Sequence, residues 1–256
     1  MKCNYNLLGK TALITGGSQG IGKSIVLALA EAGANVIVNF RKNTQLAEEV
    51  AKEARRFDVE VWLWPYDLAR DDVFESYRKF IIDKNCPPVD ILVTNASHQI
   101  RNPFEKITSE EFALQMNVNV RSTLFLIQGV IPYMKERKWG RILNIGSVQE
   151  KRPHPDMCIY AASKSALSNL VINLAPQLAS YGITINSLAP GVIATVRNEV
   201  ALSSQEYLEK TINKIPLGFI GEPTDCAQLA LLLCSDAGRY ITGCNYFVDG
   251  GMSLSF

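Results

Sequence analysis

The sequence predicts an α/β fold: one doubly wound parallel sheet of about seven strands with helices on both faces. Short apolar segments, partly β-branched, alternate with longer segments of helical periodicity along the chain, as strands joined by crossover helices do. A glycine-rich turn also follows the first apolar segment and opens the first helical one. The 256 residues contain no linker, internal repeat or low-complexity tract, so we expect a single domain over residues 1–256.

The expected elements follow from hydrophobic periodicity, taken from the N-terminus. The expected strands are Thr11–Thr15, Asn35–Asn39, Glu60–Trp64, Ile91–Asn95, Arg141–Gly146, Thr184–Ala189 and Tyr246–Val248. The expected helices are Ile21–Ala32, Thr44–Arg56, Asp72–Asp83, Ser109–Val118, Val120–Lys138, Ile159–Tyr181, Ser204–Lys214 and Thr224–Cys234. Thr108 or Ser109 is expected to cap the fourth helix, whereas Ser109 and Phe112 do not form a capping box. Pro176 should kink or loosen the long helix near Ala175, because proline removes a backbone hydrogen bond.

The first expected strand leads into a turn of seven residues: Gly16, Gly17, Ser18, Gln19, Gly20, Ile21 and Gly22. Glycines between a strand and a helix permit a tight turn and a close approach of the backbone to a pyrophosphate. The helix that follows adds free N–H groups and the positive end of its dipole. The segment is therefore a candidate dinucleotide-binding turn, and the alternative is a purely structural turn.

Four further candidates fall at or just after expected strand ends: Asp67, Asn95, Ser147 and Pro190. The carboxyl ends of parallel strands meet at one edge of a sheet, and such folds bind ligands in the crevice there. We therefore expect these residues to converge on one site.

Tyr160 and Lys164 offer proton-transfer chemistry. Four residues apart in an expected helix, they share one face. A free tyrosine titrates near pH ~10, and a nearby cation favours the phenolate. Tyr160 is thus a candidate general acid/base, with Ser147 upstream of it. Taken alone, the pair could also be two side chains on an exposed helix surface.

Together these residues resemble the short-chain dehydrogenase/reductase family, in its single-domain branch, over almost the whole chain. The resemblance implies a Rossmann-type fold and hydride transfer between a nicotinamide and a carbonyl or alcohol carbon. It also implies a catalytic tetrad of Asn119, Ser147, Tyr160 and Lys164. The candidate cofactor-binding residues are Gly16, Ser18, Gln19, Gly20, Ile21, Gly22, Arg41, Asp67, Leu68, Asn95, Ala96, Tyr160, Lys164, Pro190, Gly191, Ile193 and Thr195.

The family resemblance assigns a role to each member of the tetrad. Ser147 would hold the substrate oxygen, and Tyr160 would donate or accept the proton. Lys164 would favour the phenolate and bind the nicotinamide ribose. Asn119 would hold a water that links Lys164 to solvent, although the residue could also be a plain helix-boundary amide.

The chain departs from the family pattern beside Asn95. Thr94 and Ser97 replace an asparagine and a glycine of the family's Asn-Asn-Ala-Gly motif. Both substitutes are small and form hydrogen bonds, so we expect local repacking and a retained cofactor.

The end of the second expected strand favours NADP(H) over NAD(H). NAD-preferring relatives place an acid near this position, where the chain has Phe40 followed by Arg41 and Lys42. A guanidinium can hold a 2′-phosphate in forked geometry, and Ser18 could add a hydrogen bond. The alternative is that Arg41 and Lys42 are solvated loop charges.

The segments expected to face the substrate are polar. They are the loop Val148–Ile159 and the residues Arg197, Asn198 and Glu199. Polar groups suit a sugar-like or keto-acid molecule, since a site built for hydrogen bonds rejects apolar analogues. Alternatively, the charged residues of the loop, Glu150, Lys151 and Arg152, point to solvent.

Three other functions stay open. The chain resembles 3-oxoacyl-[acyl-carrier-protein] reductases as well as glucose-dehydrogenase-like members. It lacks their basic residue within Leu174–Gln177 but keeps Arg137, which could contact an acidic carrier protein. A non-catalytic NADP(H)-binding regulator would not need the tetrad. A lyase or epimerase of this family would carry a larger C-terminal region. The segment Gly243–Met252 resembles the family's tail, which implies a homotetramer.

The composition limits which partners and which cellular location we expect. The formal net charge of +1, with 20% charged residues, gives no reason to expect nucleic acid or an anionic membrane as partner. The basic group Lys135, Arg137, Lys138 and Arg141 should be a solvated helix end. No apolar run approaches the ~20 residues of a membrane span, and residues 1–6 lack a signal-peptide core, so the expected location is the cytoplasm.

Cysteine and histidine usage makes a metal centre improbable. The six cysteines (Cys3, Cys86, Cys158, Cys226, Cys234 and Cys244) are scattered, and we expect them to be reduced and mostly buried. Cys158 lies near Tyr160 and could approach a substrate, although simple packing is the preferred explanation. The chain has only two histidines and no clustered thiols, so no metal is expected.

Overall fold

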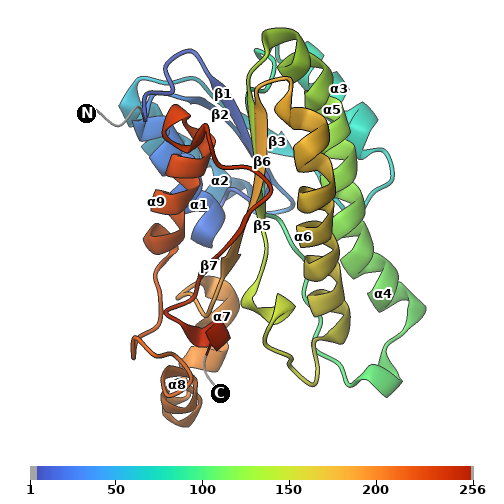
Figure 1. The fold of residues 1–256 in the computed structure, drawn as a ribbon, viewed down its shortest axis with the longest axis vertical. Helices are drawn as coiled ribbons and strands as arrows, with labels where there is room; N and C mark the ends of the chain where they lie inside the picture. The colour runs from blue at the N-terminus through green and yellow to red at the C-terminus, as the bar shows by residue number, and fades with distance from the viewer. Residues whose placement is uncertain (1–4, 255–256) are drawn as a thin grey trace.

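A seven-stranded, wholly parallel sheet forms the centre of the computed structural model, which describes residues 5–254 (Figure 1). The strand order is β3-β2-β1-β4-β5-β6-β7. The strands are β1 (Thr11–Ile14), β2 (Asn35–Phe40), β3 (Val61–Pro65), β4 (Ile91–Thr94), β5 (Gly140–Ile145), β6 (Ile183–Pro190) and β7 (Asn245–Val248). The direction of winding reverses between β1 and β4, which is where doubly wound folds open a ligand crevice. The expected α/β fold is confirmed.

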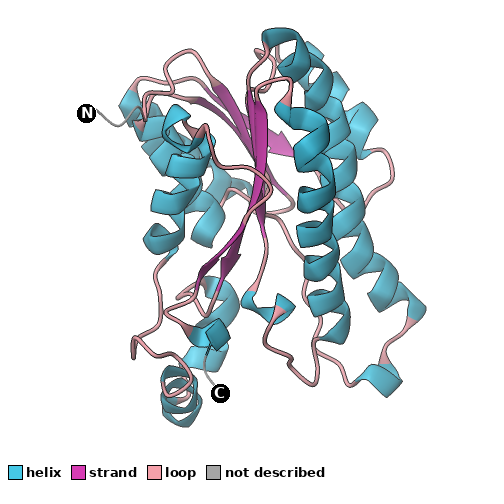
Figure 2. Cartoon of the chain, in the orientation of Figure 1, coloured by secondary structure: helices cyan, strands magenta, loops and turns pink. Residues whose placement is uncertain are grey.

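Helices cover both faces of this sheet (Figure 2). They are α1 (Gly20–Glu31), α2 (Thr44–Ala54), α3 (Val73–Asp83), α4 (Ser109–Met116), α5 (Ser122–Arg137), α6 (Cys158–Ala179), α7 (Val196–Leu202), α8 (Gln205–Ile212) and α9 (Pro223–Cys234). Figure 1 shows α1, α2 and α9 on one side of the sheet and α3, α5 and α6 on the other. The eight expected helices are present, while the short helix α7 was not expected.

Strand β1 shows why the expected strands read as unbroken apolar runs. Ala12 and Ile14 join the hydrophobic core that packs under α1 and α9, whereas Leu13 between them joins the core under α5 and α6. Side chains alternate between the faces of a strand. Both faces of a parallel sheet with helices on each side therefore require apolar residues.

Two features of α4 and α5 differ from expectation. Thr108 caps α4 as expected, but its partner in a capping box is Glu111: the hydroxyl accepts from the N–H of Glu111, and the carboxylate accepts from the N–H of Thr108. The expected break at Asn119 is also wrong, because a π-helical turn, Asn117–Arg121, joins α4 directly to α5. Asn119 lies inside that turn, and π-turns often mark functional positions.

The long helix α6 runs unbroken through Pro176 to Ala179. Pro176 stands within one turn of the helix end, so few backbone hydrogen bonds depend on it. The Gln177 side chain also donates to the carbonyl of Asn173 at 2.8 Å and supports this last turn. The expected loosening therefore does not interrupt the helix.

Arg141 is not part of a solvated helix end, which corrects that expectation. It opens β5 with only 3% of its surface exposed. Its guanidinium pairs with Asp236 at 2.9 Å and donates to the carbonyl of Ser235 at 3.1 Å. A buried guanidinium persists because these acceptors occupy its donors.

The cysteines divide by environment. Cys86, Cys226 and Cys234 are buried, and burial raises the pKa of the Cys226 and Cys234 thiols to about 12. Cys158 is exposed and Cys244 is half-buried, so the described cysteines are mostly buried, as expected. Cys3 lies outside the described residues. None of the helices within residues 5–254 has the length and apolar character needed to cross a membrane.

Candidate active site

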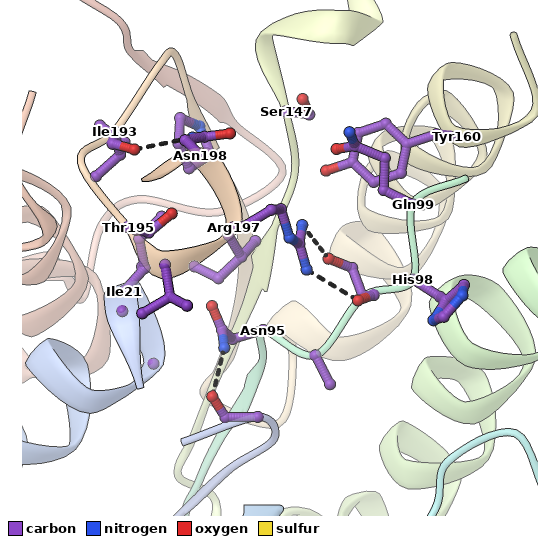
Figure 3. Close-up of a pocket in the computed structure, with 18 of the residues that line it drawn as sticks. Ile21, Asn95, His98, Gln99, Ser147, Tyr160, Ile193, Thr195, Arg197 and Asn198 are labelled. Atoms are coloured by element: carbon purple, nitrogen blue, oxygen red, sulfur yellow. Dashed lines mark hydrogen bonds between the residues drawn. The ribbon is translucent and has the colours of Figure 1, made fainter. Parts of the chain in front are cut away.

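A cleft of about 610 Å³ opens at the carboxyl ends of the strands, and Figure 3 shows part of its wall. It gathers residues from segments far apart in the sequence. Every candidate cofactor-binding residue lines it, as does Ser147; they are Gly16, Ser18, Gln19, Gly20, Ile21, Gly22, Arg41, Asp67, Leu68, Asn95, Ala96, Tyr160, Lys164, Pro190, Gly191, Ile193 and Thr195. Asn119 alone among the candidates does not line it. The expected convergence on one site is therefore what the structure shows.

The glycine turn is shaped to admit a ligand close to its backbone. Gly16 and Gly20 have φ angles of +61° and +54°, which side chains disfavour. A Cβ on Gly22 would strike the carbonyl oxygen of Gly16. Within residues 5–254 no side chain caps the start of α1, so its first N–H groups lack a side-chain acceptor where the helix borders the cleft. These features fit a pyrophosphate.

Two asparagine side chains hold this turn in place. The Nδ2 of Asn95 donates to the carbonyls of Thr15 and Gly16, each at 3.0 Å. The Oδ1 of Asn39, from β2, accepts from the N–H of Gly16 at 3.4 Å. Asn95 thus fixes the turn, and its amide nitrogen already has two acceptors.

Both substituted residues beside Asn95 form hydrogen bonds in the structure. Thr94 donates to Oδ1 of Asn144 on β5, and Asn144 donates to the hydroxyl of Ser187 on β6 at 3.1 Å. Thr94 thus belongs to a buried polar chain across three strands. Ser97 instead accepts two hydrogen bonds from Arg197 across the cleft, to its hydroxyl and its carbonyl, both at 2.9 Å (Figure 3).

At the adenosine end, the cleft wall is cationic where β2 ends. Arg41 and Lys42 line it, while Phe40 is buried. Asp67 is the single carboxylate of the described lining, and its Oδ1 already accepts from the N–H of Ala69. A 2′-phosphate would therefore meet positive charge here, which fits NADP(H) better than NAD(H).

At the other end of the cleft, Tyr160 and Lys164 are 6% and 1% exposed. The Lys164 Nζ donates to the carbonyl of Ile145 at 2.6 Å and lies 5.7 Å from the centre of the Tyr160 ring. Burial lowers the pKa of Lys164, and the neighbouring Tyr160 opposes that shift. An ammonium has three N–H donors, and in the described structure only one of them has a protein acceptor.

Ser147 stands at the end of β5 and begins a short 3₁₀ turn, Val148–Glu150. Its hydroxyl accepts from the N–H of Gln149 at 3.2 Å, and its own N–H donates to Glu150 Oε1 at 2.9 Å. The other Glu150 oxygen accepts from Ser168 and Asn245. Glu150 is half-buried and does not line the cleft, contrary to the expectation that it faces the substrate, and its carboxylate anchors the backbone of Ser147.

Only part of the polar loop Val148–Ile159 reaches the cleft. Its lining members are Val148, Gln149, His154 and Met157. Lys151 instead lies over the ring of Phe247, 4.5 Å from its centre. The expectation of a charged loop facing substrate is therefore too broad.

Asn119 does not line the cleft but forms hydrogen bonds to His98, which does. Its amide accepts from the N–H of His98 at 2.7 Å and donates to the carbonyl of His98 at 3.0 Å. It also donates to Ser163 Oγ at 2.8 Å, and that hydroxyl donates to the carbonyl of Tyr160. These bonds tie the loop after β4 to helix α6. Through Ser163, Asn119 is connected to the backbone carbonyl of Tyr160.

The sequence did not single out several residues at the substrate end. His98, Gln99, Arg101, Lys210 and Lys214 all line the cleft. The pKa of His98 and that of His154 are lowered, first by burial and then by nearby cations. No strand-end or spacing rule marks these positions, because loops and the separate helix α8 carry them.

Three comparisons place the chain among known proteins. The family model described as Enoyl-(Acyl carrier protein) reductase matches residues 16–253. The 3-oxoacyl-[acyl-carrier-protein] reductase FabG of Staphylococcus epidermidis is 35% identical over 247 residues, which cover 96% of this chain and 100% of the relative. The L-rhamnose 1-dehydrogenase (NADP(+)) of Thermoplasma acidophilum is 37% identical over 251 residues, 96% and 97% of the two chains.

Among solved structures, a gluconate 5-dehydrogenase from Burkholderia cenocepacia in complex with NADP and tartrate is similar over 99% of both chains. Its TM-score is 0.91 at 31% identity. The similarity spans every element that lines the cleft.

Proposed function

The chain belongs to the short-chain dehydrogenase/reductase family, and from that we propose an NADP(H)-dependent oxidoreductase that acts on a small, hydroxylated, sugar-like or keto-acid substrate. The observation that carries the proposal is the shared cleft: a glycine turn and Arg41 at one end, Ser147, Tyr160 and Lys164 at the other. NADP(H), when bound, supplies or accepts the hydride at its nicotinamide ring.

The protein's own part is to place the substrate oxygen and move its proton. Ser147 donates a hydrogen bond to that oxygen, and the Glu150 carboxylate keeps the Ser147 backbone in position. Tyr160 donates the proton when a carbonyl is reduced and accepts it when an alcohol is oxidised. The Lys164 ammonium favours the phenolate state between these steps. Its two remaining N–H donors are available for ribose hydroxyls.

The substrate end of the cleft supports a polar substrate. Positively charged side chains outnumber negatively charged ones in the described lining of the cleft. The lining has one carboxylate, Asp67, and the cations Arg41, Lys42, Arg101, Lys164, Arg197, Lys210 and Lys214. Like-signed charge in a cleft attracts a ligand of opposite sign. The cofactor's phosphates account for the cations near β2, and those beyond Tyr160 favour a substrate that carries a carboxylate or many hydroxyls. The named dehydrogenases of rhamnose and gluconate agree with this class.

The test is turnover of a substrate panel, followed by NADPH absorbance, with sugars, aldonic acids, keto acids and β-ketoacyl thioesters. Tyr160→Phe should retain NADPH binding and lose ~10²–10⁴-fold in turnover. The matched control is Tyr240→Phe, since Tyr240 is fully exposed. Equal turnover in the two variants would refute Tyr160 as the acid.

Cofactor choice has its own variant. Arg41→Asp should raise the Michaelis constant for NADPH, because a carboxylate repels the 2′-phosphate. In this variant the Michaelis constant for NADH should then be lower than that for NADPH. Arg239→Asp, on an exposed residue away from the cleft, controls for the change in net charge. No difference between the two variants would refute the role of Arg41.

A second candidate is 3-oxoacyl-[acyl-carrier-protein] reductase. The FabG relative, matched over its whole length, favours it. Preferred turnover of β-ketoacyl thioesters within the panel would select this candidate. NADPH binding with no turnover of any panel member would instead select a non-catalytic regulator. A homotetramer stays a prediction, which light scattering tests.

A further inference from the structure

Gln149 is the cleft-lining residue next to the reacting group whose purpose the mechanism leaves open. It stands two residues after Ser147 in the 3₁₀ turn, and its backbone N–H donates to the Ser147 hydroxyl at 3.2 Å. Its side chain lines the same cleft as Tyr160 and Lys164. The position of Gln149 is therefore fixed relative to the group that holds the substrate oxygen.

The side-chain amide of Gln149 lacks a partner. Its Oε1 is buried with no hydrogen bond, and no donor or acceptor within residues 5–254 is bonded to its Nε2. Gln115, a fully buried glutamine, behaves otherwise: its amide accepts from the N–H of Ile100 and donates to the carbonyl of Glu111. A buried polar atom without a partner destabilises a fold. Gln149 therefore has no structural bond to explain its polarity.

We propose that Gln149 binds a hydroxyl group on the carbon next to the reacting carbon, and so selects hydroxylated substrates. This inference rests on the proposed function, since Ser147 must hold the reacting oxygen for Gln149 to meet its neighbour. No partner fixes which amide atom faces the cleft, and a half rotation of the last side-chain torsion exchanges them.

A hydroxyl matches this amide in either orientation, because it both donates and accepts. A carboxylate or a ketone oxygen only accepts and would leave Oε1 without a donor. The methylene beside the carbonyl of an acyl thioester offers neither. A site with a polar group that the wrong substrate leaves unpaired discriminates strongly. Gln149 thus favours a sugar or sugar acid over a 3-oxoacyl chain.

The test compares three pairs of substrates in the wild-type protein and two variants. L-Rhamnose and D-glucose are each paired with the 2-deoxy sugar, and hydroxyacetone is paired with acetone in the direction of reduction. Wild-type kcat/KM should favour the hydroxylated member by about 10- to 100-fold. In Gln149→Met, which keeps length but removes the amide, this ratio should fall about tenfold or more. Gln128→Met, on an exposed glutamine of α5, is the control.

The possible outcomes distinguish a failure of the role of Gln149 from a failure of the proposed function. If Gln149→Met lowers kcat/KM equally for both members of a pair, the ratio stays unchanged. That result overturns the role of Gln149, while the proposed function stands. No wild-type turnover of any pair overturns the proposed function itself. A measurement without substrate adds a third arm: Gln149→Met should raise the melting temperature by about 2–6 °C, because it removes an unpaired buried oxygen. A lower melting temperature would mean that Gln149 is structural.

Discussion

Replacement of Glu150 by glutamine tests the support of Ser147. The Glu150 carboxylate accepts from three donors: the Ser147 N–H at 2.9 Å, the Ser168 hydroxyl, and the Asn245 amide at 2.6 Å. Glutamine has one oxygen and an NH₂ group. If its oxygen serves Ser168 and Asn245, the NH₂ group faces the N–H of Ser147 and leaves that donor without an acceptor.

The loss can be estimated from that one interaction. A hydrogen bond to a charged group contributes about 1.5–3 kcal/mol, so the free energy of unfolding should fall by about 2–3 kcal/mol. For a domain of this size, that corresponds to a melting temperature lower by about 4–12 °C. Displacement of Ser147 should also reduce turnover by about 10- to 100-fold, while NADPH affinity stays high because the glycine turn lies on another strand.

Differential scanning fluorimetry and steady-state kinetics measure the two effects. Glu136→Gln, on an exposed glutamate of α5, is the matched control. Ser168→Ala alone should cost less than Glu150→Gln, and the double variant should be less destabilised than the sum, because the two side chains share one network. A Glu150→Gln protein whose melting temperature and turnover both equal those of Glu136→Gln would refute this account of Ser147.

Three further outcomes follow from the described contacts. Gly22→Ala should weaken NADPH binding at least about tenfold, since its Cβ would strike the Gly16 carbonyl and distort the turn; fluorescence titration that finds wild-type affinity would contradict this. Asn119→Leu should lower the free energy of unfolding by about 3–5 kcal/mol, because both backbone groups of His98 lose their partner, and urea denaturation measures it. Burial raises the pKa of Asp90, so its ionisation weakens the fold as pH rises above its unfolded value. Asp90→Asn should therefore raise the melting temperature at pH 7, with a gain that shrinks toward pH 4.

Local sequence rules located most of the fold because each strand and helix satisfies them independently. Strand β1 is apolar on both faces, and the turn after it carries glycine where φ is positive. The helix break predicted at Asn119 was wrong because the same rules do not detect a π-turn. A π-turn changes the hydrogen-bond register of a helix without changing its apolar spacing, so periodicity alone cannot separate it from a boundary.

The proposed catalytic residues could be predicted because a spacing carries their chemistry, whereas the residues that support them could not. Tyr160 and Lys164 meet within one helix, but Glu150 meets Ser168 and Asn245 only after three elements pack together. A glutamate in a polar loop therefore looked solvent-facing or substrate-facing. Arg141 was misjudged in the same way, since its partner Asp236 is distant in sequence.

Lys164 carries an ammonium group whose burial is explained by function and not by the stability of the fold. An ammonium that is 1% exposed loses nearly all hydration, and its one acceptor among residues 5–254 is the carbonyl of Ile145. Such burial disfavours the charged form, which is why the pKa of Lys164 is lowered. Gln149 presents the same pattern in a neutral group, with a buried oxygen that no donor in the described chain satisfies. Both residues line one cleft, and both follow Ser147 along the chain. Their unsatisfied hydrogen-bonding capacity is therefore concentrated where a cofactor ribose and a hydroxylated substrate would supply the missing partners.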